Sequence, residues 1–138
     1  MAVVLSNAQR EAPVNAARMT RVAQLAIRRL KIRTRGTFTI TFINSKTIHA
    51  LNRKFLRHDH PTDVLTFRYD GEPVVGEILI APQQARAYAQ THDLSYQEEL
   101  ARYVVHGLLH WLGHKDRTVA QQRAMRQMED QLLATCLR

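Results

Sequence analysis

The residues with the clearest potential for chemistry lie in the run HGLLHWLGHKD, from His106 to Asp116. His106 and His110 are four residues apart. On a helix, that spacing places both imidazoles on one face, about 5–6 Å apart at Cβ. Neutral imidazole is the usual nitrogen ligand of zinc and similar metals. The pair therefore predicts two ligands of one metal ion.

The glycine that follows indicates where a third ligand would come from. Gly113 suits a helix stop, because glycine readily takes the left-handed conformation that ends helices. The chain would turn there and bring either His114 or Asp116 back toward the two histidines. Three protein ligands leave one coordination position for water, which is typical of a catalytic rather than a structural zinc site.

The surroundings of the histidines favour a metal over two solvated side chains. Most residues from 104 to 112 are apolar, so the helix is expected to be buried, and buried polar groups need partners. Zinc peptidases carry HExxH, with the glutamate as general base. Position 107 is glycine here, which counts against a peptidase.

Length and composition limit the class of protein. The chain has 138 residues, of which 45% are hydrophobic, so we expect one domain over residues 1–138. Cys136 is the only cysteine, which excludes an internal disulfide and fits a reducing compartment. No apolar run approaches the roughly 18–20 residues that span a bilayer, and no basic segment precedes the N-terminal apolar run. We therefore expect a cytoplasmic protein with no membrane partner and no secretory signal.

The net charge is +8, which favours a polyanionic partner such as nucleic acid. The basic side chains are densest between residues 18 and 35: Arg18, Arg21, Arg28, Arg29, Lys31, Arg33 and Arg35. This region is a candidate phosphate-binding surface, and a solvated helix face is the alternative. The glycine-rich phosphate loops of nucleotide enzymes are absent, so no nucleotide cofactor is expected.

Hydrophobic periodicity predicts the elements that position the histidines. Strands are expected at Ala2 to Leu5, Thr37 to Phe42, Val64 to Tyr69 and Gly76 to Ile80. Helices are expected from Pro13 to Leu30, from a Ser45 cap through Phe55, from Pro82 to about His92, from a Ser95 capping box to the histidines, and from Thr118 to Leu137. This order predicts an α+β (α/β-type) domain, a small mixed sheet packed by helices.

The histidine run resembles the signature of the YbeY family of bacterial endoribonucleases, H-G-x-L-H-x-x-G-[YH]-D-H. Both helix histidines and both glycines match. Lys115 and Asp116 stand where the family has aspartate and its third metal-binding histidine. The resemblance implies that Asp116 is the third ligand, since a carboxylate oxygen also binds zinc. His114 lies outside the family's ligand position and is the alternative.

A second run, NRKFLRHDHPTDVLTF from Asn52 to Phe67, resembles the family pattern N-x-x-[YF]-R-x-x-D-x-P-T-D-V-L-[ST]-F. The family's arginine, thought to meet substrate, aligns with Leu56, and Arg57 follows one residue later. The resemblance makes Arg57 a candidate substrate-binding residue. It extends from about Ile40 to Asp116 and implies a sheet of about four strands with the metal helix in a central cleft.

The resemblance implies a metal-dependent, single-strand-specific endoribonuclease that holds one divalent ion, Zn²⁺, per chain. Its expected roles are maturation of ribosomal RNA, at the 3′ end of the small-subunit RNA, and ribosome quality control. Its expected partners are ribosomal RNA and ribosomal small-subunit proteins. The ion would lower the pKa of a bound water and polarise the phosphoryl oxygen. The sequence assigns no protein general base.

Two other functions stay open from the sequence. One is a ribosome- or RNA-binding assembly factor in which the metal is structural, with His114 and Asp116 both supplying ligands. Binding of RNA without turnover would favour it. The other is a small metallopeptidase, which Gly107 disfavours.

Overall fold

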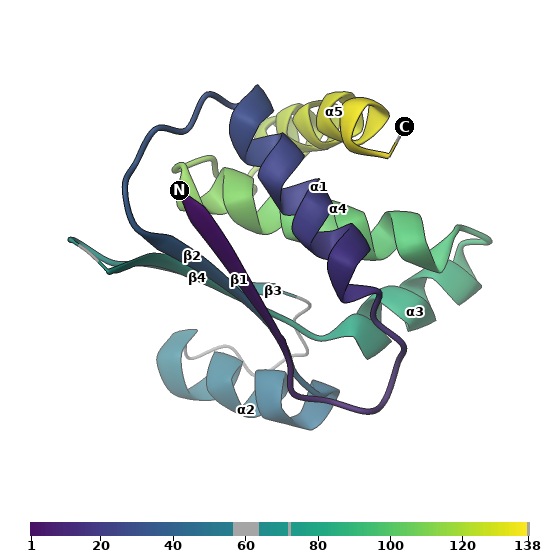
Figure 1. Ribbon diagram of the computed structural model, residues 1–138. Coiled ribbons are helices and arrows are strands. Elements are labelled where there is room, and N and C mark those ends of the chain that lie inside the picture. The colour runs from purple at the N-terminus through teal and green to yellow at the C-terminus, as the bar shows by residue number, and fades with distance from the viewer. Residues whose placement is uncertain (57–63, 72, 138) are drawn as a thin grey trace.

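The computed structural model describes residues 1–56, 64–71 and 73–137 and confirms the predicted α+β fold (Figure 1). Along the chain its elements are β1 (Ala2–Asn7), α1 (Ala16–Arg29), β2 (Thr37–Phe42), α2 (Ser45–Leu56), β3 (Val64–Arg68), β4 (Val74–Ile80), α3 (Pro82–Thr91), α4 (Tyr96–Trp111) and α5 (Val119–Cys136). Within the described ranges, no helix combines the length and apolar character needed to cross a bilayer.

The four strands form one mixed sheet in the order β1-β2-β4-β3. Strand β2 runs parallel to both β1 and β4, and β3 runs antiparallel to β4. The alternation in β2 sets its two faces, because successive side chains of a strand point to opposite sides. Phe38, Ile40 and Phe42 are fully buried on one of these faces. The predicted four-stranded mixed sheet is therefore confirmed.

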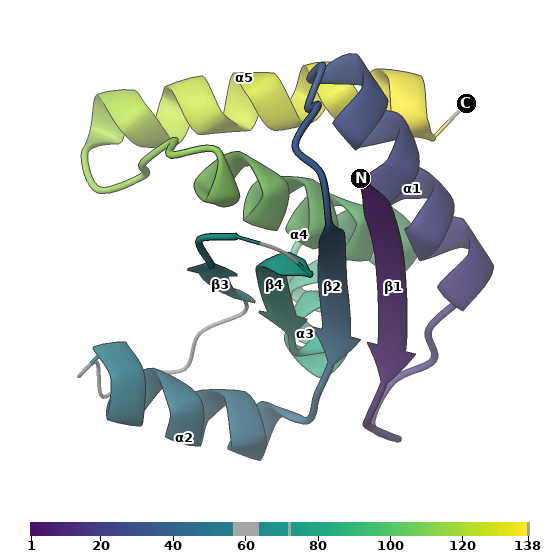
Figure 2. The same cartoon turned by 60° about the vertical axis from the view of Figure 1, so that its left-hand side comes forward.

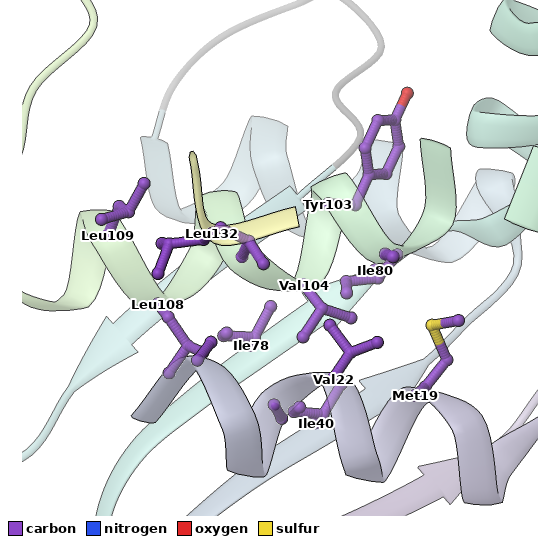
Figure 3. Packing of buried hydrophobic residues seen from close by; sticks show 14 of the residues in the cluster. Met19, Val22, Ile40, Ile78, Ile80, Tyr103, Val104, Leu108, Leu109 and Leu132 are labelled. Atoms are coloured by element: carbon purple, nitrogen blue, oxygen red, sulfur yellow. The ribbon is translucent and has the colours of Figure 1, made fainter. Parts of the chain in front are cut away.

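Helices cover both faces of the sheet, with α1, α4 and α5 on one side and α2 on the other (Figures 1 and 2). The larger core lies under the first group and joins Val22 of α1, Ile78 of β4 and Leu108 of α4 (Figure 3). A smaller cluster around Ile48 and Leu65 lies under α2. Helix α4 contacts α1, α3, α5, β3 and β4, so the helix with the two histidines is the central one.

Two glycines let α4 approach the sheet closely. A Cβ at Gly107 would lie 2.5 Å from Cδ1 of Ile78, and a Cβ at Gly76 would lie 2.5 Å from Nε1 of Trp111. The indole Nε1 of Trp111 donates to the carbonyl of Val75 at 2.9 Å, which fixes the end of α4 on β4. Position 107 therefore faces the sheet, and a glutamate there would meet Ile78.

Two helix starts differ from the predicted ones, for the same reason. Helix α1 begins at Ala16 and not at Pro13, because Oδ1 of Asn15 accepts a hydrogen bond from N of Arg18 at 3.0 Å. Asn44, and not Ser45, caps α2 through a 2.8 Å bond from N of Thr47 to Oδ1 of Asn44. In both places an asparagine side chain satisfies a free amide of the first turn.

The starts of the two helices that carry the site match the prediction. The Ser95 side chain caps α4 by accepting from N of Glu98 at 3.3 Å. Thr118 caps α5 and forms a capping box with Gln121. The first turns of α4 and α5 are therefore both fixed by side-chain hydrogen bonds.

Candidate metal centre

Helix α4 places His106 and His110 side by side. Their ring centroids are 4.6 Å apart, with 72° between the ring planes. Their side chains are 26% and 29% exposed, whereas Leu108 and Leu109 between them are fully buried. The apolar part of the helix therefore faces the core and leaves both imidazoles open to a neighbouring cavity.

Gly113 ends the helix as predicted. Its φ of 105° lies in the left-handed region, and its N donates to the carbonyl of His110 at 2.9 Å. The amide of His114 donates to the carbonyl of Leu109 at 3.1 Å, the pattern of a Schellman helix end. Nε2 of Gln122 then donates to the carbonyl of Asp116 at 3.2 Å, so α5 holds the returning loop in place.

This loop brings Asp116 to the two histidines. Oδ2 of Asp116 lies 3.3 Å from Nε2 of His110 and 3.5 Å from Nε2 of His106. One ligand atom from each of the three residues lies within 4.8 Å of the other two. His114 is exposed and lies outside this group, which is the only such group of histidine, cysteine, aspartate and glutamate in the described ranges.

The three side chains fit a divalent metal ion. A tetrahedral ion with bonds of about 2.0–2.2 Å keeps its ligands about 3.3–3.6 Å apart. The two contacts from Asp116 match that separation. Two imidazole nitrogens and a carboxylate oxygen form a donor set that suits zinc and related ions. The group could therefore hold one metal ion with an open coordination position.

Glu129 of α5 adds a contact that the sequence analysis did not identify. Its Oε2 lies 2.6 Å from Nδ1 of His106, and its Oε1 accepts from Nη1 of Arg102 at 3.0 Å. Glu129 is only 4% exposed. It follows Met125 by four residues and precedes Leu132 by three, so it lies on the apolar stripe of α5. A carboxylate on a buried stripe needs a partner. The position of Glu129 on that stripe was therefore the sequence feature that could have identified it as part of the site.

Arg102 lies between two carboxylates of α5. Its Nη2 donates to Oδ1 of Asp130 at 2.7 Å, in addition to its bond to Glu129. Burial lowers the pKa of Arg102, but the hydrogen bonds and the negative charges of Asp130 and Glu129 together raise it more, so the pKa lies above its ordinary value. The guanidinium thus stays charged and balances the buried carboxylate of Glu129.

The histidines line a cavity of about 760 Å³ between β3, α4 and α5. This volume is within the usual range for ligand sites. Arg68 and Arg126 are exposed side chains on its wall. Nη1 of Arg68 donates to the carbonyl of Trp111 at 2.7 Å, and its guanidinium lies 4.6 Å above the Trp111 ring. The cavity therefore combines the metal-binding group with fixed positive charge.

The family description "Endoribonuclease YbeY" matches residues 4–136. The chain belongs to the YbeY endoribonuclease family. Among its relatives, endoribonuclease YbeY of Rhodopirellula baltica is 41% identical over 116 residues, which are 80% of this chain and 60% of the relative. Endoribonuclease YbeY of Flavobacterium johnsoniae is 33% identical over 100 residues, 72% of each chain. The predicted family, and with it the class of RNA-cleaving hydrolase, is confirmed.

A solved structure shows the same fold. The solution structure of a Thermotoga maritima protein aligns with a TM-score of 0.66 at 21% identity, over 97% of this chain and 88% of that one. The match spans 60% of the length of the Rhodopirellula relative. The predicted substrate-binding residue, Arg57, lies outside the described residues. Leu56, which aligns with the arginine of the family pattern, is the last residue of α2.

Proposed function

We propose that this chain is a single-strand-specific, metal-dependent endoribonuclease in ribosomal RNA maturation, at the 3′ end of the small-subunit RNA, and in ribosome quality control. The observation that carries the proposal is the group of His106, His110 and Asp116 on the wall of a cavity, in a chain of the YbeY family. The expected partners are ribosomal RNA and small-subunit proteins. With a single cysteine, the chain also suits the cytoplasm.

The proposed cofactor is one Zn²⁺ ion, held by Nε2 of both histidines and by a carboxylate oxygen of Asp116. When bound, such an ion polarises a phosphoryl oxygen and lowers the pKa of a coordinated water. All three donors are partly exposed, so RNA can reach the site from the cavity. We assign no side chain as general base. The cavity carboxylates Asp116, Glu99 and Glu129 all lie within 4.0 Å of a histidine or arginine.

Two arginines are placed to hold the RNA backbone in the cavity. Guanidinium groups bind phosphate oxygens through paired N–H donors. The bond from Arg68 to the Trp111 carbonyl fixes that guanidinium beside the site, while Arg126 lies exposed on α5. Since Leu56 aligns with the family's arginine, we infer that Arg68 and Arg126 contribute to phosphate binding here.

The cavity supports the proposed specificity for single strands. Proteins reach RNA bases and sugars most readily where the strand is unpaired and its nucleotides can turn outward. A cavity of about 760 Å³ beside the metal-binding group suits such a segment.

The alternative function, an RNA-binding assembly factor with a structural metal, would need a closed set of four protein ligands. In the part of the chain that the structure describes, three donors converge, and His114 is not one of them. The open position therefore favours catalysis. A peptidase remains disfavoured, because position 107 faces Ile78 and not the cavity.

The proposal is tested with a ribosomal RNA fragment that carries a single-stranded 3′ end. Cleavage by the purified protein is measured before chelation, after chelation, and after addition of zinc, manganese or magnesium. The same sequence annealed into a full duplex is the control. We expect cleavage of the single strand only, its loss on chelation and its return with zinc. Binding without cleavage under every metal condition would favour the assembly factor, and cleavage unaffected by chelation would contradict metal dependence.

A further inference from the structure

The metal-facing orientation of His106 depends on a buried pair of charges. Oε2 of Glu129 lies 2.6 Å from Nδ1 of His106, and Glu129 is 4% exposed. An ionised carboxylate only accepts hydrogen bonds, so the ring must carry its proton on Nδ1. The lone pair of Nε2 is then free, and this nitrogen is the one that lies 3.5 Å from Oδ2 of Asp116.

Arg102 keeps the carboxylate of Glu129 in place. It donates to Oε1 at 3.0 Å, which leaves Oε2 for the histidine. Without that cation, Glu129 would be an uncompensated charge in the interface between α4 and α5, a costly arrangement. Arg102 precedes His106 by four residues on the same face of α4, so one turn of helix sets the spacing of the two partners.

The two histidines differ in the partner of Nδ1. Among the described residues, only the Nδ1 of His106 has a carboxylate partner, and His110 contacts Asp116 and the His106 ring. Partners behind a metal-binding histidine fix its tautomer and orientation, and their loss typically costs about 10–100-fold in metal affinity. Loss of the carboxylate on α5 should therefore weaken metal binding by its effect on His106.

We propose that Glu129, held by Arg102, is a positioning residue that fixes His106 as the Nδ1–H tautomer and so presents Nε2 to the metal. The proposal rests on the metal site of the proposed function. It also gives α5 a specific role, since the packing of α5 on α4 delivers the carboxylate. Glu129 itself is not expected to touch the RNA or the metal.

The first test measures zinc affinity by competition with a chromophoric chelator, for wild type, Glu129→Ala and Asp130→Ala. Asp130 is the matched control, because it also bonds Arg102 but is exposed and does not contact His106. We expect Glu129→Ala to bind zinc about 10–100-fold more weakly and Asp130→Ala to bind it as wild type does. Equal affinity of folded Glu129→Ala and wild type would overturn the proposal.

The second test reads the tautomer of His106 in the metal-free protein. Long-range proton–nitrogen NMR at about pH 8.5, well above the ordinary histidine pKa of about 6.5, reports which ring nitrogen carries the proton. His106→Gln assigns the signals. Wild type should show Nδ1–H, and Glu129→Ala should shift the ring toward Nε2–H. An unchanged Nδ1–H form in Glu129→Ala would contradict the proposed role.

A third variant keeps the test decisive if Glu129→Ala does not fold. Glu129→Gln preserves the size and one acceptor oxygen but removes the charge, so it should fold, bind zinc more weakly and show a less deshielded Nδ1 proton. Unchanged affinity and proton shift in this variant would overturn the proposal. Both readouts, zinc affinity and the Nδ1 proton of His106, are made without RNA. A protein whose zinc affinity depends on Glu129 but which cuts no RNA would therefore refute only the proposed function.

Discussion

At the scale of single residues, the proposed third donor is a carboxylate and not a third imidazole. Oδ2 of Asp116 lies 3.3 and 3.5 Å from the two imidazole nitrogens, so its position suits a shared metal ion. An anionic oxygen also lowers the net charge of a bound divalent ion more than a neutral imidazole would.

Asp116→Asn and Asp116→His should have opposite effects on metal binding. The asparagine removes the charge and should weaken zinc affinity by at least about tenfold. Loss of a residue that only supports a metal ligand already costs about 10–100-fold, so a change in a direct ligand should cost no less. The histidine restores a nitrogen donor and should retain tight binding. Zinc titration against a competing chelator measures both. His114→Asn is the control and should bind zinc as wild type does, since His114 lies outside the group. Weaker zinc binding by His114→Asn, with Asp116→Asn unaffected, would make His114 the third ligand in place of Asp116.

The residue types predicted only part of this site. Histidine spacing and Gly113 depend on helix geometry alone, so a local pattern could give the two imidazoles and the turn. Asp116 needed the family signature to be preferred over His114. The contact of Glu129 with His106 joins residues 23 positions apart, on two helices whose packing is decided by the whole core, so no local pattern could give it.

At the scale of elements, the depth of α4 against the sheet sets where the histidines lie. Gly107 is one residue after the first histidine, and its backbone lies so close to β4 that a Cβ would be 2.5 Å from Ile78. Ile78 is fully buried, so it cannot move away without displacing the core.

Gly107→Ala should destabilise the fold although alanine is the better helix former by about 1 kcal/mol. Overpacking of a filled core costs about 1–3 kcal/mol, which exceeds that gain over most of the range, so we expect a net loss of up to about 2 kcal/mol in the free energy of unfolding. Urea denaturation measures it. Gln127→Ala, at an exposed position of α5, is the control and should change stability by less than about 0.5 kcal/mol. A more stable Gly107→Ala would show that the sheet yields there.

The elements themselves were largely predictable, and their starts less so. Short apolar runs, the alternation in TFTITF, helical stripes and helix-start signals together predicted the strands and helices, because each of these patterns is local in the sequence. Pro13 and Ser45 were wrong as starting points, since Asn15 and Asn44 provide the side chains that bond the first turn. The strand order β1-β2-β4-β3 depends on pairing between distant segments and was outside the reach of local patterns.

At the scale of the whole molecule, charge is distributed unevenly. No acidic residue occurs between Glu11 and Asp59, while arginines on α1 such as Arg21, Arg28 and Arg29 are exposed. Helix α1 lies on the same side of the sheet as α4 and α5 (Figure 2). An RNA longer than the cavity could therefore be held by its phosphates over this helix as well.

Removal of charge from α1 should change the salt dependence of RNA binding. For a single strand, each lost phosphate contact lowers the slope of log affinity against log salt by about 0.7. We expect Arg28→Gln with Arg29→Gln to lower the slope by up to about 1.4 while a short oligonucleotide is still cut at the wild-type rate. The control Gln24→Ala changes an exposed, uncharged residue of the same helix. A slope equal to that of wild type would remove α1 from the RNA-binding surface.

The most direct test of a metal-dependent RNA hydrolase at this site compares three proteins purified identically: wild type, His110→Ala and His114→Ala. Each is given the same single-stranded ribosomal RNA fragment, and folding is checked by circular dichroism. Wild type and His114→Ala should cleave at similar rates, whereas folded His110→Ala should lose about a hundredfold or more, as expected when several kcal/mol of metal assistance are removed. Equal cleavage by His110→Ala and wild type would place the activity elsewhere and contradict the account.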